Sequence, residues 1–296
     1  MDLTDQINVA LRGLSSGAIY ALVGMGFNVT YATTSIFNFA QGEFVMVGAM
    51  LGIFFWVSAG WPMVAALVLA VGLTFLIGMA EERFAVRPAE RFGHAAFGWF
   101  LSTLGASIIL ASAFALAMGS EPRNFPELFS DTPLRVGEVL VVPQQMVLIV
   151  LAVAAAVGLT VFYNRTLVGR AMGAIAQNRN AAALRGIPVA RMSMLSFGLS
   201  AGIAAITGFM VAPLTTAYAA MGALFLFKGF IAAAVGGIPD IRGALVGGLI
   251  LGLVEGFGSH YIGAGYREAV TFAVLLVVLL VKPNGLFGSR ATTRTV

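Results

Sequence analysis

Thr34 to Gly52 read TSIFNFAQGEFVMVGAMLG, a stretch that is apolar enough to lie inside a lipid bilayer. It nevertheless carries Asn38, Gln41 and Glu43 within six positions. A carboxylate at bilayer depth is costly unless it faces protein or a water-filled cavity, so an intramembrane glutamate predicts a functional site. Three glycines in the same stretch allow another backbone to approach closely. We therefore expect a tightly packed membrane span that serves a polar function.

The rest of the chain has the composition of a membrane protein. Of its 296 residues 59% are hydrophobic and 10% are charged, whereas soluble domains are about 25% charged. Continuous apolar runs predict helices rather than a barrel of alternating strands. The sequence thus predicts one all-α polytopic domain over residues 1–296 with about 8–9 transmembrane helices. The runs lie near 9–31, 36–58, 62–80, 95–118, 144–163, 192–217, 225–238, 243–258 and 268–282.

Two of these runs are short for a membrane span. Residues 225–238 and 243–258 fall below the roughly 20 residues that a span needs. They are predicted either as half-helices in a re-entrant hairpin or as two full passes. Small residues four apart recur along several runs and predict close helix packing. The pairs include Gly13 with Gly17, Gly48 with Gly52, Gly198 with Gly202, Gly243 with Gly247, and Gly248 with Gly252 and Gly256.

The distribution of arginine and lysine predicts the orientation. The connection 164–191 holds five arginines and no acidic residue, and the tail after Val281 holds Lys282, Arg290 and Arg294. Positive loops remain in the cytoplasm, so both are predicted there. The connection 119–143 is mostly acidic, through Glu121, Glu127, Asp131 and Glu138, and is predicted on the other side. The count of spans then places the N-terminus outside the cell and the C-terminus inside.

The sequence offers little support for common enzyme chemistries or for nucleic-acid binding. The histidines, His94 and His260, are too far apart in sequence for a helical metal-ligand pair, and there is no cysteine. Lys228 and Lys282 follow Phe227 and Val281, so neither completes a P-loop. The net charge of +4 comes from arginines in loops without interleaved aromatic residues. We expect no metal, no bound cofactor, no nucleic acid, and ATP hydrolysis only in another chain.

The connection 164–191 reads NRTLVGRAMGAIAQNRNAAALRGIPVAR. Its alanine-rich part predicts a helix from Gly173 to Leu184, and Gly186 with Pro188 gives the usual stop signals. Such a helix suits docking to a cytoplasmic partner, which we favour. The alternative is an ordinary positive loop that only sets the topology.

The sequence resembles the permease subunits of the branched-chain amino acid ABC transporters. The resemblance rests on GLSSGAIYALVGMGFNVTYATTSIFNFAQGEFVMVGAMLG near the N-terminus, on GRAMGAIAQNRNAAALRGIPVARM in the loop, and on AAAVGGIPDIRGALVGGLILGLVEG followed by LLVVLLVKPNGLFG. Together these blocks cover nearly the whole chain in order. The resemblance implies a permease of the type II-like class of ABC importers.

It also implies a set of partners and a location. The chain would pair with itself or a related permease, be driven by two cytoplasmic ATPase subunits, and receive its solute from a periplasmic binding protein. It would lie among the lipids of a bacterial inner membrane. The loop 164–191 would be the coupling element, with these residues near the ATPase surface: Gln177, Asn178, Arg179, Ala182, Arg185 and Gly186.

The substrate and the driving force leave alternatives open. Gln41 stands where many relatives carry histidine, and residues 239–243 read Pro-Asp-Ile-Arg-Gly where relatives commonly differ. Branched-chain or other amino acids are expected as substrates, with urea, amides or small carboxylic acids as the alternative. An ion-coupled carrier or channel that uses Glu43 is the alternative from another class of protein. A scaffold without transport fits poorly with the buried carboxylates.

Five residues are candidates for the substrate path, namely Tyr20, Asn28, Asn38, Gln41 and Glu43. Each also has a structural interpretation. Glu43 pairs equally well with a neighbouring helix, Asn38 and Gln41 suit interhelical hydrogen bonds, and Tyr20 and Asn28 suit anchors at the membrane interface. Glu255, on a glycine-rich run, is expected to pair with a structural partner such as Lys228.

Overall fold

The computed structural model describes residues 3–91, 95–129, 134–136 and 139–288, and within these the predicted all-α class is confirmed. His94 and the charged residues Asp131, Glu138, Arg290 and Arg294, all named above, lie outside the described residues. The helices of the first half are α1 (Leu3–Thr34), α2 (Gln41–Gly52), α3 (Met63–Glu81), α4 (Arg87–Arg91) and α5 (Ala95–Met118). Those of the second half are α6 (Pro143–Arg165), α7 (Leu167–Gln177), α8 (Arg179–Leu184), α9 (Val189–Val211), α10 (Gly222–Gly236), α11 (Ile241–Tyr261) and α12 (Arg267–Val281).

Short irregular elements complete the fold. Wider π-helical segments, Ile53–Ser58 and Glu82–Val86, extend α2 and α3, and a 3-10 turn, Ala264–Tyr266, precedes α12. An antiparallel hairpin of β1 (Leu134–Val136) and β2 (Val139–Val141), with Leu134 opposite Val141, lies in the connection before α6. The sequence did not predict this hairpin.

Eight helices in the described part of the chain are long and apolar enough to cross a membrane. The prediction that 243–258 is a half-helix is wrong, because α11 runs over 21 residues from Ile241 to Tyr261. Asp240 caps its N-terminus by accepting a hydrogen bond from the Gly243 amide at 2.6 Å, which starts the helix before the apolar run. The α2 and α12 helices reach 18 residues together with the irregular segments that adjoin them, whereas α10, with 15 residues, stays shorter than a span.

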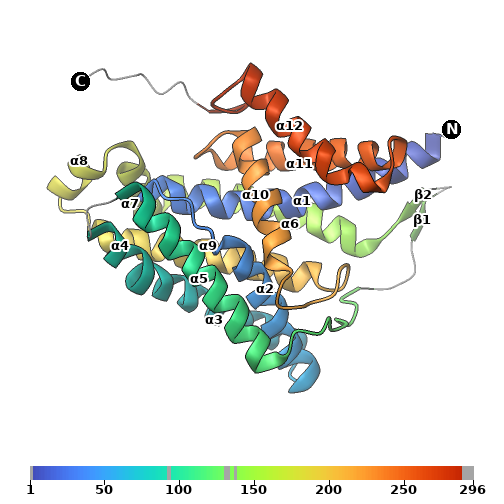
Figure 1. Ribbon diagram of the computed structural model, residues 1–296, viewed down its shortest axis with the longest axis horizontal. Coiled ribbons are helices and arrows are strands. Elements are labelled where there is room, and N and C mark those ends of the chain that lie inside the picture. The colour runs from blue at the N-terminus through green and yellow to red at the C-terminus, as the bar shows by residue number, and fades with distance from the viewer. Residues whose placement is uncertain (1–2, 92–94, 130–133, 137–138, 289–296) are drawn as a thin grey trace.

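The long helix α1 lies at the centre of the bundle and packs against α6, α9, α10 and α11. The α2 and α9 helices are also largely buried, whereas α5 and α12 lie at the periphery and expose apolar side chains on the outside of the bundle. Figure 1 shows the N-terminus and the β hairpin at one end of the bundle, with α7 and α8 at the other. The arginine-rich connection and the N-terminus are therefore at opposite ends.

Glycines bring α1 and α11 into backbone contact, as their spacing predicted. A Cβ atom added to Gly17 would lie 2.6 Å from the carbonyl oxygen of Gly248, and one added to Gly13 would lie 2.8 Å from that of Gly252. Gly48 of α2 meets the backbone of Ala205 in α9 in the same way. Apolar helices gain no hydrophobic free energy when they associate in lipid, because the lipid tails are equally apolar. Close packing of this kind is therefore a main source of stability.

The first span does not continue directly into the second. Residues 35–40 form a non-helical link that ends in a turn at residues 39–40, and α2 begins at Gln41 rather than near residue 36 as predicted. Ser35 turns the chain with a φ of 58°, in the left-handed region that few non-glycine residues occupy. Irregular backbone at membrane depth is tolerated only inside protein or along a cavity. The link thus marks the place where function is expected.

Replacing Gly17 with leucine should prevent α1 from seating on α11. The obstructing atoms belong to the backbone of Gly248 and Leu249, which cannot rotate away, so the expected cost is about 3 kcal/mol or more. Thermal unfolding in detergent, followed by size-exclusion chromatography, measures the loss. Gly158→Leu is the matched control, because an added Cβ there meets nothing within 4 Å. Equal stability of the two variants would contradict the packing described here.

Candidate functional site

The side chain of Asn38 fixes the position of the link between α1 and α2 through two hydrogen bonds. Its side-chain oxygen accepts a hydrogen bond from the Ala40 amide at 2.8 Å, which turns the chain into α2. Its amide nitrogen donates to Glu81 Oε2 at the end of α3, also at 2.8 Å. Both side chains are buried. The interruption between α1 and α2 is therefore tied to α3 through a hydrogen bond between an amide and a carboxyl group.

Gln41, the first residue of α2, contacts α1 and α9 at once. Ser200 Oγ lies 2.7 Å from Gln41 Oε1 and 2.8 Å from the Gly26 carbonyl oxygen, so its single proton can serve either acceptor. The Gln41 amide packs directly on Gly26, where any side chain would collide with it. Gln41 Nε2 has no hydrogen-bond partner among the described residues.

Glu43 is buried between α2, α5 and α10, with 6% of its surface exposed. Ser107 of α5 donates a hydrogen bond to its Oε1 at 3.3 Å. The carboxylate lies against Gly222, the first residue of α10, where a Cβ atom would be 2.7 Å from the Glu43 carboxyl carbon. Its Oε2 has no partner in the part of the chain that the structure describes. Glu43 is thus able to accept a further hydrogen bond from a cationic or N–H group.

Tyr20 and Asn28 lie away from these three residues, along α1. Asn28 donates to the Asp240 carbonyl oxygen at 2.6 Å and so joins α1 to the turn between α10 and α11. Tyr20 donates to Glu255 Oε1 at 3.0 Å and accepts from Arg267 at 3.2 Å. The structure therefore brings together Asn38, Gln41 and Glu43 near the link, whereas Tyr20 and Asn28 occupy other contacts. A path role for any of the five stays a prediction.

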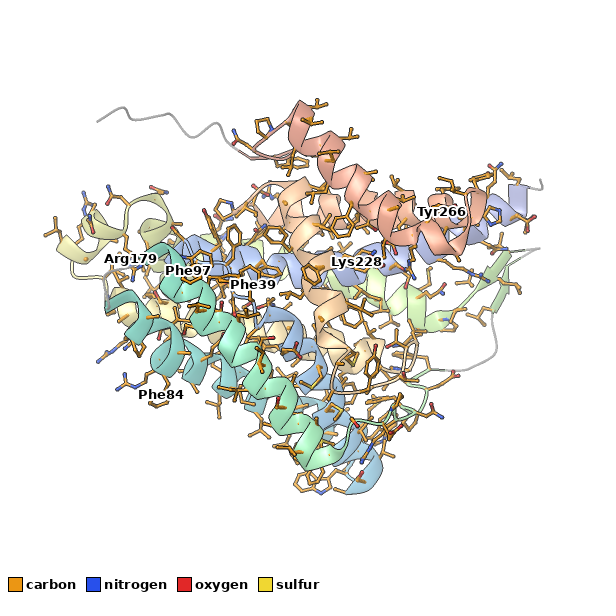
Figure 2. The ribbon with its side chains drawn as sticks, in the orientation of Figure 1. Phe39, Phe84, Phe97, Arg179, Lys228 and Tyr266 are labelled. Carbon is orange, nitrogen blue, oxygen red and sulfur yellow. The ribbon has the colours of Figure 1, made fainter. Side chains whose placement is uncertain are left out.

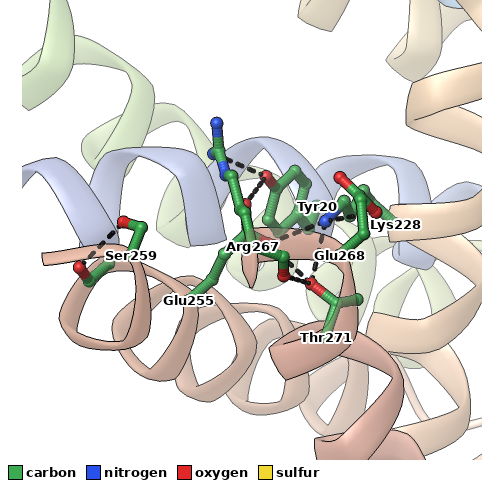
Figure 3. A network of polar contacts seen from close by, with 8 residues as sticks. Tyr20, Lys228, Glu255, Ser259, Arg267, Glu268 and Thr271 are labelled. Atoms are coloured by element: carbon green, nitrogen blue, oxygen red, sulfur yellow. Dashed lines mark hydrogen bonds and ion pairs between the residues drawn. The ribbon is translucent and has the colours of Figure 1, made fainter. Parts of the chain in front are cut away.

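A network of charges surrounds the buried Glu255 of α11 (Figure 3). Lys228 of α10 lies 3.0 Å from Glu255 Oε2, which confirms the expected pairing. Arg267 forms a very short ion pair with Oε1 of the same carboxylate. Lys228 also donates to Thr271 at 2.8 Å and pairs with Glu268 at 3.0 Å. Residues of α1, α10, α11 and α12 thus share one neutralised cluster.

Several partners in these contacts were missed from the sequence. Glu81 could have been found, since it is a carboxylate at the end of an apolar run. Ser107 and Ser200 gave no signal, because single serines are common in membrane helices. Gly222 gave none either, since only the fold shows that it faces Glu43.

The connection 164–191 forms two helices, so the single helix predicted from Gly173 to Leu184 is wrong. Asn178 interrupts it and caps α8, accepting a hydrogen bond from the Ala181 amide at 2.9 Å. Gly186 ends α8 as expected, with a φ of 82°. Ala182 packs inward with Met172 and Met192. The remaining predicted coupling residues are exposed: Gln177, Asn178, Arg179, Arg185 and Gly186.

Replacing Lys228 with methionine should strongly destabilise the protein. Glu255 is 1% exposed and would lose one of its two cations, and breaking a buried ion pair costs about 3 kcal/mol or more. Thermal unfolding measures the effect, with the exposed Lys282→Met as control. The double variant Lys228→Met, Glu255→Gln should recover part of the loss. A Lys228→Met protein as stable as the control would refute the role of this pair.

Comparisons with known proteins agree on one family. The family described as "Branched-chain amino acid transport system / permease component" matches residues 9–279. The chain is 33% identical to the permease protein LivH of Escherichia coli K12 and 32% identical to BraD of Pseudomonas aeruginosa, each over 94% of both chains. Both are described as permease proteins of high-affinity branched-chain amino acid transport systems.

A solved structure shares the fold. The structure titled "PsaBC from Streptococcus pneumoniae in complex with Fab" contains a chain that matches with a TM-score of 0.52 at 10% identity, over 92% of this chain and 91% of the other. At that identity the likeness concerns the fold alone. The family match covers nearly all of the chain, and the described residues contain eight helices that are long and apolar enough to cross a membrane, so the chain belongs to the permease components of branched-chain amino acid transport systems.

Proposed function

We propose that this permease forms the translocation path of an ATP-driven importer of branched-chain amino acids. The interruption between α1 and α2 is the observation that carries the proposal. It places irregular backbone and buried polar groups of Asn38, Gln41 and Glu43 inside a membrane bundle. Interrupted helices at the midplane characterise solute sites in many transporters. The names of the relatives supply the class of solute.

The partners follow from what the sequence lacks and from its loop. Neither lysine completes a P-loop, so two cytoplasmic ATPase subunits would hydrolyse ATP. The exposed face of α7 and α8 would dock to them, with the N-terminus outside the cell and the C-terminus inside. A second permease, identical or related, would complete the path, and a periplasmic binding protein would deliver the solute. The complex would lie in a bacterial inner membrane.

Purification from native membranes tests the assembly and the driving force. ATPase subunits should copurify with the chain, and vesicles that contain the complex should accumulate leucine only with ATP on the cytoplasmic side. Competition with urea, amides and small carboxylic acids should leave leucine uptake unchanged. Uptake without ATP and without partner chains would overturn the proposal.

Replacing Leu184 with glutamate should weaken docking of the ATPase subunits. Leu184 is 90% exposed on α8, and burial of a leucine at an interface contributes about 1.5–3 kcal/mol. We expect at least about a tenfold loss of affinity, measured by copurification at graded ATPase concentrations. Leu140→Glu is the control and should bind normally, because Leu140 belongs to β2, which lies at the opposite end of the bundle from α8 (Figure 1). Equal binding by both variants would count against docking through α8.

A carrier driven by an ion gradient is the second candidate, favoured by the unpartnered oxygen of Glu43. Glu43→Gln should lower leucine uptake by about 10- to 100-fold while the complex stays assembled, because it removes a charged hydrogen-bond acceptor. The exposed Glu121→Gln is the matched control. Loss of folded protein would instead show that Glu43 is structural. Uptake by the unaltered protein that follows a proton or sodium gradient without ATP would establish the second candidate.

A further inference from the structure

An apolar cavity of about 170 Å³ lies beside the link between α1 and α2. Six phenylalanines, two leucines and one isoleucine line it, contributed by α1, the link, α10 and α12. The ring of Phe230 stands edge-on to Phe37 at 5.4 Å and to Phe27 at 6.0 Å, measured between ring centroids. Such edge-to-face contacts are favourable and fix the positions of the rings. The cavity thus has a defined wall at the place where the first span is interrupted.

The size of the cavity suits one aliphatic group. An apolar cavity of about 150 Å³ in a protein core stays dry and binds benzene, so this one accepts a group of four to six carbon atoms. Its lining offers no polar side chain. A polar group placed there would lose its hydrogen bonds with water and gain none. The cavity therefore favours a butyl-like group over an amide or a carboxylate.

A carboxylate lies about one helical turn from this wall. Gly42 packs on Leu226, which lines the cavity, since a Cβ atom at Gly42 would lie 2.7 Å from that of Leu226. The next residue, Glu43, faces Gly222, four residues earlier in α10. Four residues correspond to about 6 Å along a helix. An amino acid with its ammonium group at Glu43 Oε2 would thus have its side chain within reach of the cavity.

We propose that this cavity is the subsite for the aliphatic side chain of the transported amino acid, with Phe230 as its main size-determining residue. The inference rests on the proposed function, because it takes the solute to be a branched-chain amino acid. Under this proposal the permease itself discriminates between amino acids, in addition to any discrimination by a binding protein. Glu43 supplies the complementary charge for the ammonium group.

Filling the cavity should discriminate against the longer side chain. We expect Phe230→Trp to lower the ratio of leucine to valine uptake by about tenfold, since one methylene in a tight pocket changes selection by about 10- to 200-fold. Vesicles that contain the whole complex and its binding protein are used, so the binding protein is the same in every sample. Phe84→Trp, at an exposed position at the edge of the bundle away from Phe39 (Figure 2), should leave the ratio unchanged.

Enlarging the cavity should have the opposite effect. Phe272 lines the cavity and is 54% exposed, so Phe272→Ala is expected to fold even where Phe230→Trp is not. It should raise the uptake of phenylalanine relative to leucine severalfold. Unchanged ratios in a folded Phe272→Ala complex would overturn the inference, as would an equal loss of leucine and valine in Phe230→Trp. A cavity filled by a lipid chain or a second permease would give one of these results.

Leucine import by the unaltered complex distinguishes failure of the proposed function from failure of the subsite. Normal leucine import by the unaltered complex, with unchanged ratios in both variants, would reject the subsite and leave the proposed function intact. Absence of leucine import by the unaltered complex would reject the proposed function and the subsite with it.

Discussion

Backbone contact between α1 and α11 is the constraint on which the rest of the bundle depends. The glycines of the two helices remove the side chains that would keep the helices apart. In lipid, where apolar faces gain little from meeting each other, this closeness replaces the hydrophobic drive of a soluble core. It also carries Tyr20 of α1 to Glu255 of α11, and so brings the charged cluster into the protein interior. The same glycines thus serve packing and allow charges to be buried in pairs.

With α1 fixed, the interruption at residues 35–40 has a fixed place among its neighbours. The polar side chains within it and just after it each have a partner on a different helix, Asn38 on α3, Gln41 on α9 and Glu43 on α5. Pairing of this kind lowers the cost of polar atoms in lipid. It does not satisfy all of them, because Oε2 of Glu43 remains open within the described residues. A wholly apolar cavity lies about one helical turn away along α10. An amphipathic solute requires this combination of a charged group and an apolar cavity.

Much of this arrangement follows from the sequence, and the rest depends on tertiary contacts. Continuous apolar runs predict the spans, glycine spacing predicts close helix packing without saying which helices meet, and a lone buried carboxylate at Glu255 predicts a partner such as Lys228. The length of α11 was underestimated because Asp240 starts the helix before the apolar run begins. The partners of Glu43 were not predictable, since Ser107 and Gly222 are distant in sequence and ordinary in type. Apolar periodicity specifies helices well but specifies little about which helices meet.

The interruption at Asn178 has a mechanical consequence. It divides the connection 164–191 into two helical arms, the inner α7 and the outer α8, with a one-residue joint between them. Ala182 on the outer arm and Met172 on the inner arm rest on the same apolar patch as Met192 of α9. The inner arm also lies against α1, the helix that ends at the link. A displacement of the outer arm is therefore transmitted to α9 and α1 through direct packing contacts. These are the two helices that contact Gln41, through Ser200 and Gly26.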